Sequence, residues 1–170
     1  MEVAIPQNCS VRIEGGYLIV KAGSEEHKIH FDSKKIRVEI KDGSVAMVSI
    51  KKQRRKTHAM INSIRKHLTN MFGGGSVVYQ KKLSVIYAHF PVSIEVKGKA
   101  IQIKNFLGEK VPREAVIVGN TQVQVSGQEI NVKGSNKEEV GQTAANIVQA
   151  VRIVGKDRRV FQDGIYLIKE

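Results

Sequence analysis

Residues 11–21 of the chain, VRIEGGYLIVK, alternate apolar and polar side chains on both sides of a Gly-Gly pair. The pattern returns 81 residues later in residues 92–104, VSIEVKGKAIQIK, with Gly98 at the turn. Alternation with a period of two around a glycine turn predicts a β-hairpin with one buried face. The recurrence indicates that the chain contains one structural plan twice.

A second hairpin and then a helix are predicted in each half. The second hairpins turn at Asp42-Gly43 and at Gly127, which separate short stretches of alternating apolar residues. A helix follows each hairpin, because apolar residues recur on one helical face. In the first half this face carries Met60, Ile61, Ile64, Leu68, Met71 and Phe72, before glycines 73–75. In the second half a capping box of Asn136 and Glu139 precedes Val140, Ala144, Ile147 and Val151.

In a domain this small, the apolar faces of a sheet and a helix are buried by packing against each other. We therefore predict an α+β fold of two tandem copies, each with a small antiparallel sheet packed against one helix. The first repeat occupies residues 1–75. The second occupies residues 76–170 and ends in a basic tail.

The composition favours a nucleic-acid partner. The 170 residues include 28 Lys and Arg but 16 Asp and Glu, so the net charge is +12 and the pI is near 9.9. Such a charge attracts polyanions. The sequence has no apolar run long enough to cross a bilayer, and its start lacks the layout of a signal peptide. We therefore expect a cytoplasmic protein without membrane association, in which the single Cys9 forms no internal disulfide.

The last part of the chain, residues 149–166, brings four cations, two aromatic rings and an Asp-Gly turn close together. A basic segment with aromatic rings after a helix suits the groove and the phosphates of a folded nucleic acid. Phe161 and Tyr166 are candidates for stacking on bases, and packing in the core explains each of them equally well. The four cations are Arg152, Lys156, Arg158 and Arg159.

A second basic cluster, residues 51–56, lies at the start of the first predicted helix. The helix dipole favours anions at this end, so helix stability does not explain the cations. We predict that they contact phosphates, at a small cost in helix stability. A solvated run of charge is the alternative. The predicted contact residues are Lys51, Lys52, Arg54 and Arg55.

No set of residues points to catalysis or to a metal. His27 and His30 are three apart in a predicted strand and so face opposite sides, and His58 and His67 point apart on their helix. Glycines 73–75 follow a helix and lack the Lys-Ser/Thr ending of a phosphate-binding loop. We expect no enzyme, no catalytic residue, no metal, no cofactor and no small-molecule substrate.

Four segments carry a resemblance to a known family. They are residues 70–91, which end in SVIYAHFP, residues 105–110 (NFLGEK), residues 139–147 (EVGQTAANI) and residues 159–166 (RVFQDGIY). In this order they are similar to the universal large-subunit ribosomal protein L-six, in its archaeal and eukaryotic branch. The resemblance covers nearly the whole chain.

The resemblance implies a structural constituent of the large ribosomal subunit that binds folded ribosomal RNA near the sarcin-ricin loop and the stalk base. It implies large-subunit ribosomal RNA and neighbouring ribosomal proteins as partners, with most RNA contacts in the second domain. Carried onto this sequence, the contacts are Arg152, Lys156, Arg158, Arg159, Gln162, Asp163 and Gly164, with help from Lys81, Lys82, Lys97, Lys99 and Lys104.

Two other classes of protein stay open. One is a non-ribosomal protein that binds structured RNA, and the other is a basic protein-interaction scaffold whose charges serve solubility. Binding that does not respond to salt would favour the scaffold. Residues 105–110 interrupt a strand pattern, and we predict a loop whose tip either packs on the tail or meets RNA.

Overall fold

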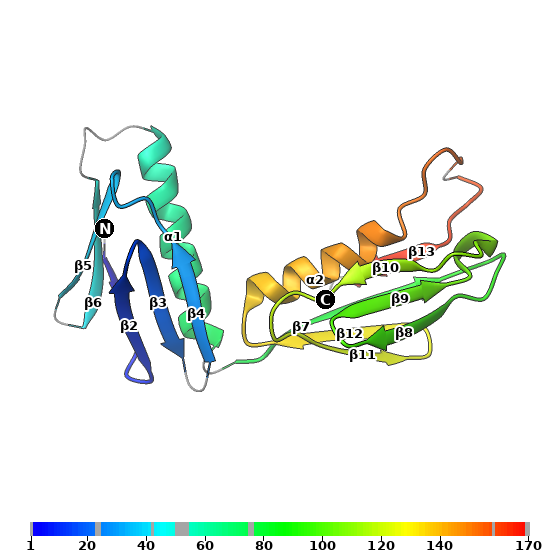
Figure 1. Cartoon of the computed structure of the whole chain (residues 1–170), viewed down its shortest axis with the longest axis horizontal. Coiled ribbons are helices and arrows are strands. Elements are labelled where there is room, and N and C mark those ends of the chain that lie inside the picture. Colours follow the sequence, from blue (N-terminus) through cyan, green and yellow to red (C-terminus); the bar gives the residue numbers. More distant parts are fainter. Residues whose placement is uncertain are drawn as a thin grey trace. The chain divides into compact units, whose positions relative to one another are not determined.

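The chain divides into two compact units, Met1–Val78 and Tyr79–Glu170 (Figure 1). Each unit combines one long helix with antiparallel strands, which confirms the predicted α+β class. The strands of each unit form two small sheets. The computed structural model describes residues 2–22, 25–41, 43–49, 55–74, 77–157 and 159–168.

The first unit contains helix α1 (Arg55–Gly74) and two three-stranded sheets, with strand orders β2-β3-β4 and β1-β6-β5. The hairpin predicted around the Gly-Gly pair is present, with Ile13 opposite Leu18. Both glycines of its turn adopt positive φ, which glycine reaches without steric cost. The strands are β1 (Glu2–Ala4), β2 (Cys9–Glu14), β3 (Tyr17–Ala22), β4 (Glu25–His30), β5 (Ile36–Lys41) and β6 (Ser44–Ser49).

Helix α1 contacts strands of both sheets of the first unit. The residues that it buries are Ile61, Ile64, Leu68, Met71 and Phe72. They share one core with side chains of β3 and β6 that include Leu18, Val20, Val45 and Met47. Met60, predicted on the same face, is partly buried at the edge of this core. The apolar stripe read from the sequence therefore explains which side of α1 faces inward.

The second unit contains helix α2 (Lys137–Ala150), a four-stranded sheet of order β11-β12-β7-β13 and a three-stranded sheet of order β10-β9-β8. The predicted hairpins are β8 with β9 and β11 with β12. Strand β13 pairs with β7 and was not predicted, because its partner lies far away in the sequence. The elements are β7 (Tyr79–Ile86), β8 (Ser93–Lys97), β9 (Ala100–Lys104), the 3-10 helix η1 (Phe106–Gly108), β10 (Arg113–Val116), β11 (Gln122–Ser126), β12 (Glu129–Gly134) and β13 (Gly164–Leu167).

Helix α2 begins where its capping residues predict. The Asn136 side chain accepts a hydrogen bond from the backbone N–H of Glu138 at 3.0 Å and donates to the Glu139 carboxylate at 3.1 Å. The first of these bonds satisfies a backbone N–H that the helix start leaves unpaired. Helix α2 contacts strands of both sheets, and its buried face joins them into one core. The end of α2 is thereby held beside β10 and β13.

Candidate nucleic-acid interface

Three loops meet at the end of the second unit where α2 finishes (Figure 1). The three loops are residues 87–92, residues 105–112 and residues 151–163, and we call them together the loop end. The third loop alone, residues 151–163, we call the tail. The Asn105 side chain donates to the Pro91 carbonyl at 3.0 Å, and the Ala88 N–H donates to the Asp163 carboxylate at 3.0 Å. The loop end is therefore one connected surface.

Arg113, the first residue of β10, holds the end of α2. Its Nη1 donates to the carbonyl oxygens of Ala150 at 3.0 Å and Arg152 at 3.1 Å. A helix end leaves such carbonyls without a partner inside the helix. Its Nη2 and Nε donate to the two carboxylate oxygens of Glu109 at 2.6 and 2.7 Å, and its guanidinium lies 4.7 Å from the centroid of the Phe106 ring. One side chain thus ties the second loop to the start of the tail.

The charges of Glu109 and Arg113 reinforce this contact. The hydrogen bonds from Arg113 hold the pKa of Glu109 below its usual value, and the same bonds raise the pKa of Arg113. Lys156 of the tail also lowers the pKa of Glu109, by a weaker electrostatic effect. A cation at the carboxyl end of α2 agrees with the helix dipole. Arg113 therefore acts as a charged cap that directs the tail away from α2.

Asp163 anchors the other end of the tail from inside. Its side chain is 1% exposed, and its Oδ1 accepts hydrogen bonds from the Ala88 N–H and from His89 Nδ1 at 3.3 Å. Since a carboxylate only accepts, Nδ1 carries the proton. Burial raises the pKa of Asp163, but the hydrogen bonds from Ala88 and His89 together lower it by more. The net pKa therefore lies below its usual value. The ionised carboxylate belongs to the framework of the tail.

Replacing Asp163 by Asn is expected to destabilise the second unit by about 1–3 kcal/mol at pH 7. The hydrogen bonds from Ala88 and His89 then have an uncharged acceptor, and the new amide N–H groups are buried at the position of Oδ2, which has no hydrogen-bond partner. A lowered folded-state pKa stabilises the fold above the unfolded-state pKa, about 4, and this stabilisation disappears as the pH falls through the folded-state pKa. The difference between wild type and variant should therefore shrink in acid.

Urea unfolding between pH 7 and pH 3 measures this difference. The matched control is Asp157→Asn, at an exposed carboxylate whose Oδ1 accepts from the Arg159 N–H. An amide oxygen preserves that bond, so the control should stay near wild type. A difference between wild type and Asp163→Asn that is the same at every pH would contradict the role assigned to the ionised carboxylate.

Phe161 lies near two polar side chains, His89 of the 87–92 loop and Lys156 of the tail. Its ring centroid is 5.5 Å from that of His89, with the planes tilted by 32°, and the Lys156 ammonium is 4.7 Å from the Phe161 centroid. The side chain is half-buried. The cation over the ring is a favourable electrostatic contact. Phe161 thus positions Lys156 while keeping one part of its ring accessible.

Tyr166 closes the turn after the tail. Its hydroxyl donates to the Gln162 carbonyl at 2.9 Å, and its side chain is 49% exposed. A Cβ added at Gly164 would lie 3.1 Å from the Tyr166 ring, so the ring packs directly on the glycine backbone. A side chain at Gly164 would therefore displace this ring. The half-exposed ring remains open to solvent on its other side.

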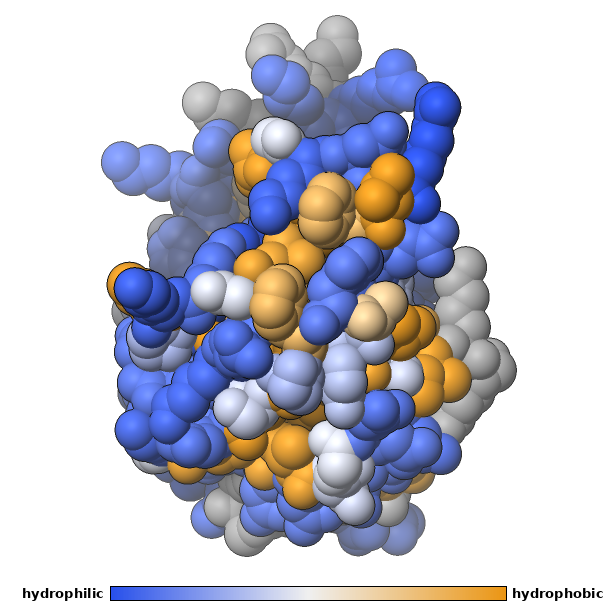
Figure 2. Space-filling view, turned by 90° about the vertical axis from the view of Figure 1, so that its right-hand side faces the viewer, coloured by the Kyte–Doolittle hydropathy of each residue, from blue (hydrophilic) through white to orange (hydrophobic). Residues whose placement is uncertain are grey.

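The outer part of the tail is exposed and carries both apolar and charged side chains. In Figure 2, which faces the loop end, hydrophobic and hydrophilic side chains lie intermingled. Val154 is 81% exposed and Val160 is 62% exposed. The exposed cations beside them are Arg152, Lys156 and Arg159. Such a surface offers both charge for phosphates and apolar groups for sugar or base faces.

A hollow of about 440 Å³ lies between the end of α2 and β13. Arg152 and Tyr166 contribute to its lining together with Phe161 and apolar residues of α2 and β13. Concave sites with apolar walls and a few polar groups are the usual places for a ligand group. Arg152 of the tail thus borders a depression in the surface.

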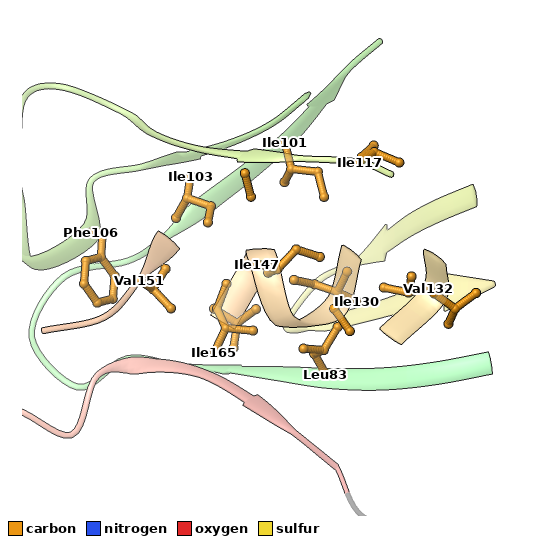
Figure 3. Packing of buried hydrophobic residues seen from close by; sticks show 14 residues of the cluster. Leu83, Ile101, Ile103, Phe106, Ile117, Ile130, Val132, Ile147, Val151 and Ile165 are labelled. Atoms are coloured by element: carbon orange, nitrogen blue, oxygen red, sulfur yellow. The ribbon is translucent and has the colours of Figure 1, made fainter. Parts of the chain in front are cut away.

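The loop predicted over residues 105–110 contains η1, and its main contact is with the core. Phe106 is 1% exposed, and Figure 3 shows its ring beside Val151, at the end of the cluster that also contains Ile103. Asn105 and Leu107 have left-handed backbones. The buried ring supports Arg113 and so connects the core to the tail.

The other lysines of the second unit lie on strands and on a hairpin turn. Lys97 and Lys104 share the carboxylate of Glu95, at 3.7 and 2.7 Å, and the pKa of Glu95 is lowered chiefly by its hydrogen bond from Lys104. Their charges are partly compensated. Lys99 is exposed in the β8–β9 turn. Lys81 and Lys82 are half-buried on β7.

Some predicted contacts lie outside the described residues. These are Arg158 of the tail and the first three cations of the other cluster, Lys51, Lys52 and Arg54. Arg55 is described, and it begins α1. Within the described part of the chain, no helix is long and apolar enough to cross a membrane. In the same ranges no three His, Cys, Asp or Glu residues gather in a way that could hold a metal ion.

Sequence reasoning missed the residues that hold the tail in place. Arg113, Glu109 and His89 did not belong to the basic run or to an apolar stripe, so no periodicity marked them. Their roles depend on loops that are distant in the sequence; His89 and Asp163, for example, are 74 positions apart. One local signal was available, since Glu109 and Arg113 are four residues apart with opposite charge.

Comparisons with known proteins agree on one family. The family model described as "Ribosomal protein L6" matches residues 90–164, which include the loop end almost entirely. Relatives named "Large ribosomal subunit protein uL6" match nearly the whole chain. The relative from Methanococcus vannielii is 41% identical, over 99% of this chain and 92% of its own length. The relative from Methanosarcina mazei is 42% identical, over 99% of this chain and 95% of its own length. The relative from Archaeoglobus fulgidus is 40% identical, over 99% of this chain and 88% of its own length.

Proposed function

Because the chain belongs to the ribosomal protein L6 family, we propose that it is a structural constituent of the large ribosomal subunit and binds folded ribosomal RNA through the loop end. Members of this family are structural ribosomal proteins, and the chain is not an enzyme. Its place in the subunit is near the sarcin-ricin loop and the stalk base, as the family resemblance implies. Its partners are ribosomal RNA and neighbouring ribosomal proteins, in the cytoplasm.

The observation that carries the proposal is a tail that exposes cations and is held from inside at both ends. Arg113 fixes its start through the carbonyls of Ala150 and Arg152, and Asp163 fixes its end through Ala88. A segment that is ordered before binding loses less conformational freedom on binding. The anchoring therefore supports a specific RNA contact better than a loose basic tail would.

The charge of the tail is directed outward. Of its two carboxylates, Asp163 is buried, and the exposed Asp157 accepts a hydrogen bond from the Arg159 backbone. The cations Arg152, Lys156 and Arg159 face solvent. Phosphate contacts of this kind position a protein on RNA, while the exposed Val154 and Val160 suit sugar and base surfaces. We propose the same role for Arg158, and a weaker general attraction for Lys81, Lys82, Lys97, Lys99 and Lys104.

A sedimentation experiment tests this function. A tagged copy of the chain, expressed in archaeal cells, should migrate with the large subunit in a sucrose gradient at moderate salt. High salt should release part of it, because phosphate contacts weaken as salt rises. A protein that stays at the top of the gradient would overturn the ribosomal assignment. Migration with other RNA would favour a non-ribosomal RNA binder, and association that ignores salt would favour a protein scaffold.

A further inference from the structure

Helix α1 of the first unit carries a broad exposed face with cations and no acid. Its 20 residues contain no Asp or Glu. Arg55 and Lys66 lie about 20° apart around the helix axis and about 16 Å apart along it, given 3.6 residues and 5.4 Å per turn. Lys56 and Arg65, nine residues apart, lie about 180° apart around the axis and so flank the line from Arg55 to Lys66 on opposite sides. All four side chains are exposed.

These four cations are not compensated within the described residues. In those ranges no acidic side chain forms an ion pair with any of them. Elsewhere in the described residues, some cations have an acidic neighbour. Lys35 pairs with Asp32 at 2.7 Å, and Lys104 pairs with Glu95 at the same distance. The positive charge of the α1 face is therefore available to an outside partner.

Helices α1 and α2 carry opposite charges in their first turns, where the helix dipole acts. Helix α2 has Glu138 and Glu139 in its first turn, where the dipole favours acids. Helix α1 has no acid in its first turn and carries Arg55 and Lys56 there instead. Since this arrangement does not stabilise the helix, its explanation lies in a contact outside the unit. An anion near the start of α1 would remove the unfavourable interaction.

The chemistry of the face selects the class of partner. Across Arg55–Gly74, all of which the structure describes, no large apolar side chain is exposed. Protein interfaces usually centre on buried apolar or aromatic side chains, which this face lacks. A nucleic-acid backbone instead presents closely spaced negative charges, about one per 1.7 Å of axis in a duplex. Arg55 and Lys66, about 16 Å apart along one side of the helix, match such a ligand.

We propose that the exposed face of α1 is a second RNA-binding surface, which holds the phosphate backbone of a folded ribosomal RNA segment by charge without reading its bases. This inference rests on the proposed function, because it takes ribosomal RNA as the ligand. It adds to that function a contact on the first unit. The face acts independently of the loop end, so each surface can be removed while the other remains.

The first experiment neutralises the face. The variant Arg55→Gln, Lys56→Gln, Arg65→Gln, Lys66→Gln is compared with a control of equal charge, Arg12→Gln, Lys21→Gln, Lys28→Gln, Lys34→Gln, whose sites are also exposed in the first unit. Binding to purified large-subunit ribosomal RNA is measured from 50 to 200 mM salt. The salt slope is the steepness with which the logarithm of the binding constant falls as the logarithm of the salt concentration rises. Losing two phosphate contacts lowers it by about 1.4–1.8. Over this range wild-type affinity should then fall about seven- to twelvefold more than that of the α1 variant.

The second experiment uses the unaltered protein, so it does not depend on the folding of a variant. Acetylation of surface lysines is measured by mass spectrometry with and without the same RNA. Lys56 and Lys66 should lose reactivity when RNA is added. Lys21 and Lys28, on the sheet of the same unit, should keep theirs.

The outcomes separate this inference from the proposed function. Equal salt slopes for the α1 variant and its control, or unprotected Lys56 and Lys66, would overturn the inference. The proposed function would still stand if removing the tail cations weakened binding. If removing neither set of cations weakened binding, both ideas would fail together.

Discussion

Replacing Arg152, Lys156 and Arg159 by alanine in one variant is expected to weaken binding to purified large-subunit ribosomal RNA by about 100- to 500-fold at 0.1 M salt. Each phosphate contact adds about 0.7–0.9 to the salt slope, which is about five- to eightfold in affinity between 1 M and 0.1 M salt. The slope itself should fall by about 2.1–2.7. Filter binding over a series of salt concentrations measures both quantities.

The matched control removes three other cations from the same unit, Lys97, Lys99 and Lys104. Two of them already share the Glu95 carboxylate, so this variant should lose less than about tenfold. Thermal unfolding should change little for the tail variant, because exposed side chains contribute weakly to stability. Equal losses of affinity in both variants would mean that overall charge, and not the tail, holds the RNA.

Phe106→Ala is expected to destabilise the second unit by about 3–5 kcal/mol, the usual cost of removing a buried aromatic ring. The ring is 1% exposed and packs in the same core as Val151 and Ile103 (Figure 3). The variant also removes the surface on which the Arg113 guanidinium lies. The tail should therefore loosen in addition to the loss of global stability. Hydrogen exchange, resolved by residue, measures both effects in the second unit alone.

Phe90→Ala is the matched control, because the same ring is removed from a site that is 45% exposed. Its cost should be about 1 kcal/mol or less. The first unit should keep its exchange rates in both variants, since the two units have separate cores. If the two alanine variants were equally stable, Phe106 would not support the core as its burial indicates.

The helices and hairpins could be predicted because their signals are local. Ile61, Ile64 and Leu68 recur at helical spacing, and the side that they define is the buried side of α1. Asn136 marks the start of α2 because a cap acts within one helical turn. The Gly-Gly turn between β2 and β3 likewise depends on a few neighbouring residues.

The candidate site could be predicted in composition but not in arrangement. The cations Arg152, Lys156 and Arg159 were identified from charge density alone, and the structure places them on one exposed segment. The family resemblance put Asp163 among the RNA contacts, whereas its side chain is buried against the 87–92 loop. Burial depends on which distant segment packs there, and charge density carries no information on this.

By itself, the sequence determined the α+β class, the repeated hairpin-and-helix plan, the positive charge and the family, because each follows from periodicity, composition or residue identity along the chain. The tertiary structure alone decided how the tail is held. Strand β13 pairs with β7, Arg113 reaches the carbonyls after α2, and Asp163 accepts from Ala88. These contacts join residues separated by 37 to 84 positions. Such contacts form when the core brings distant segments together, so no local pattern encodes them.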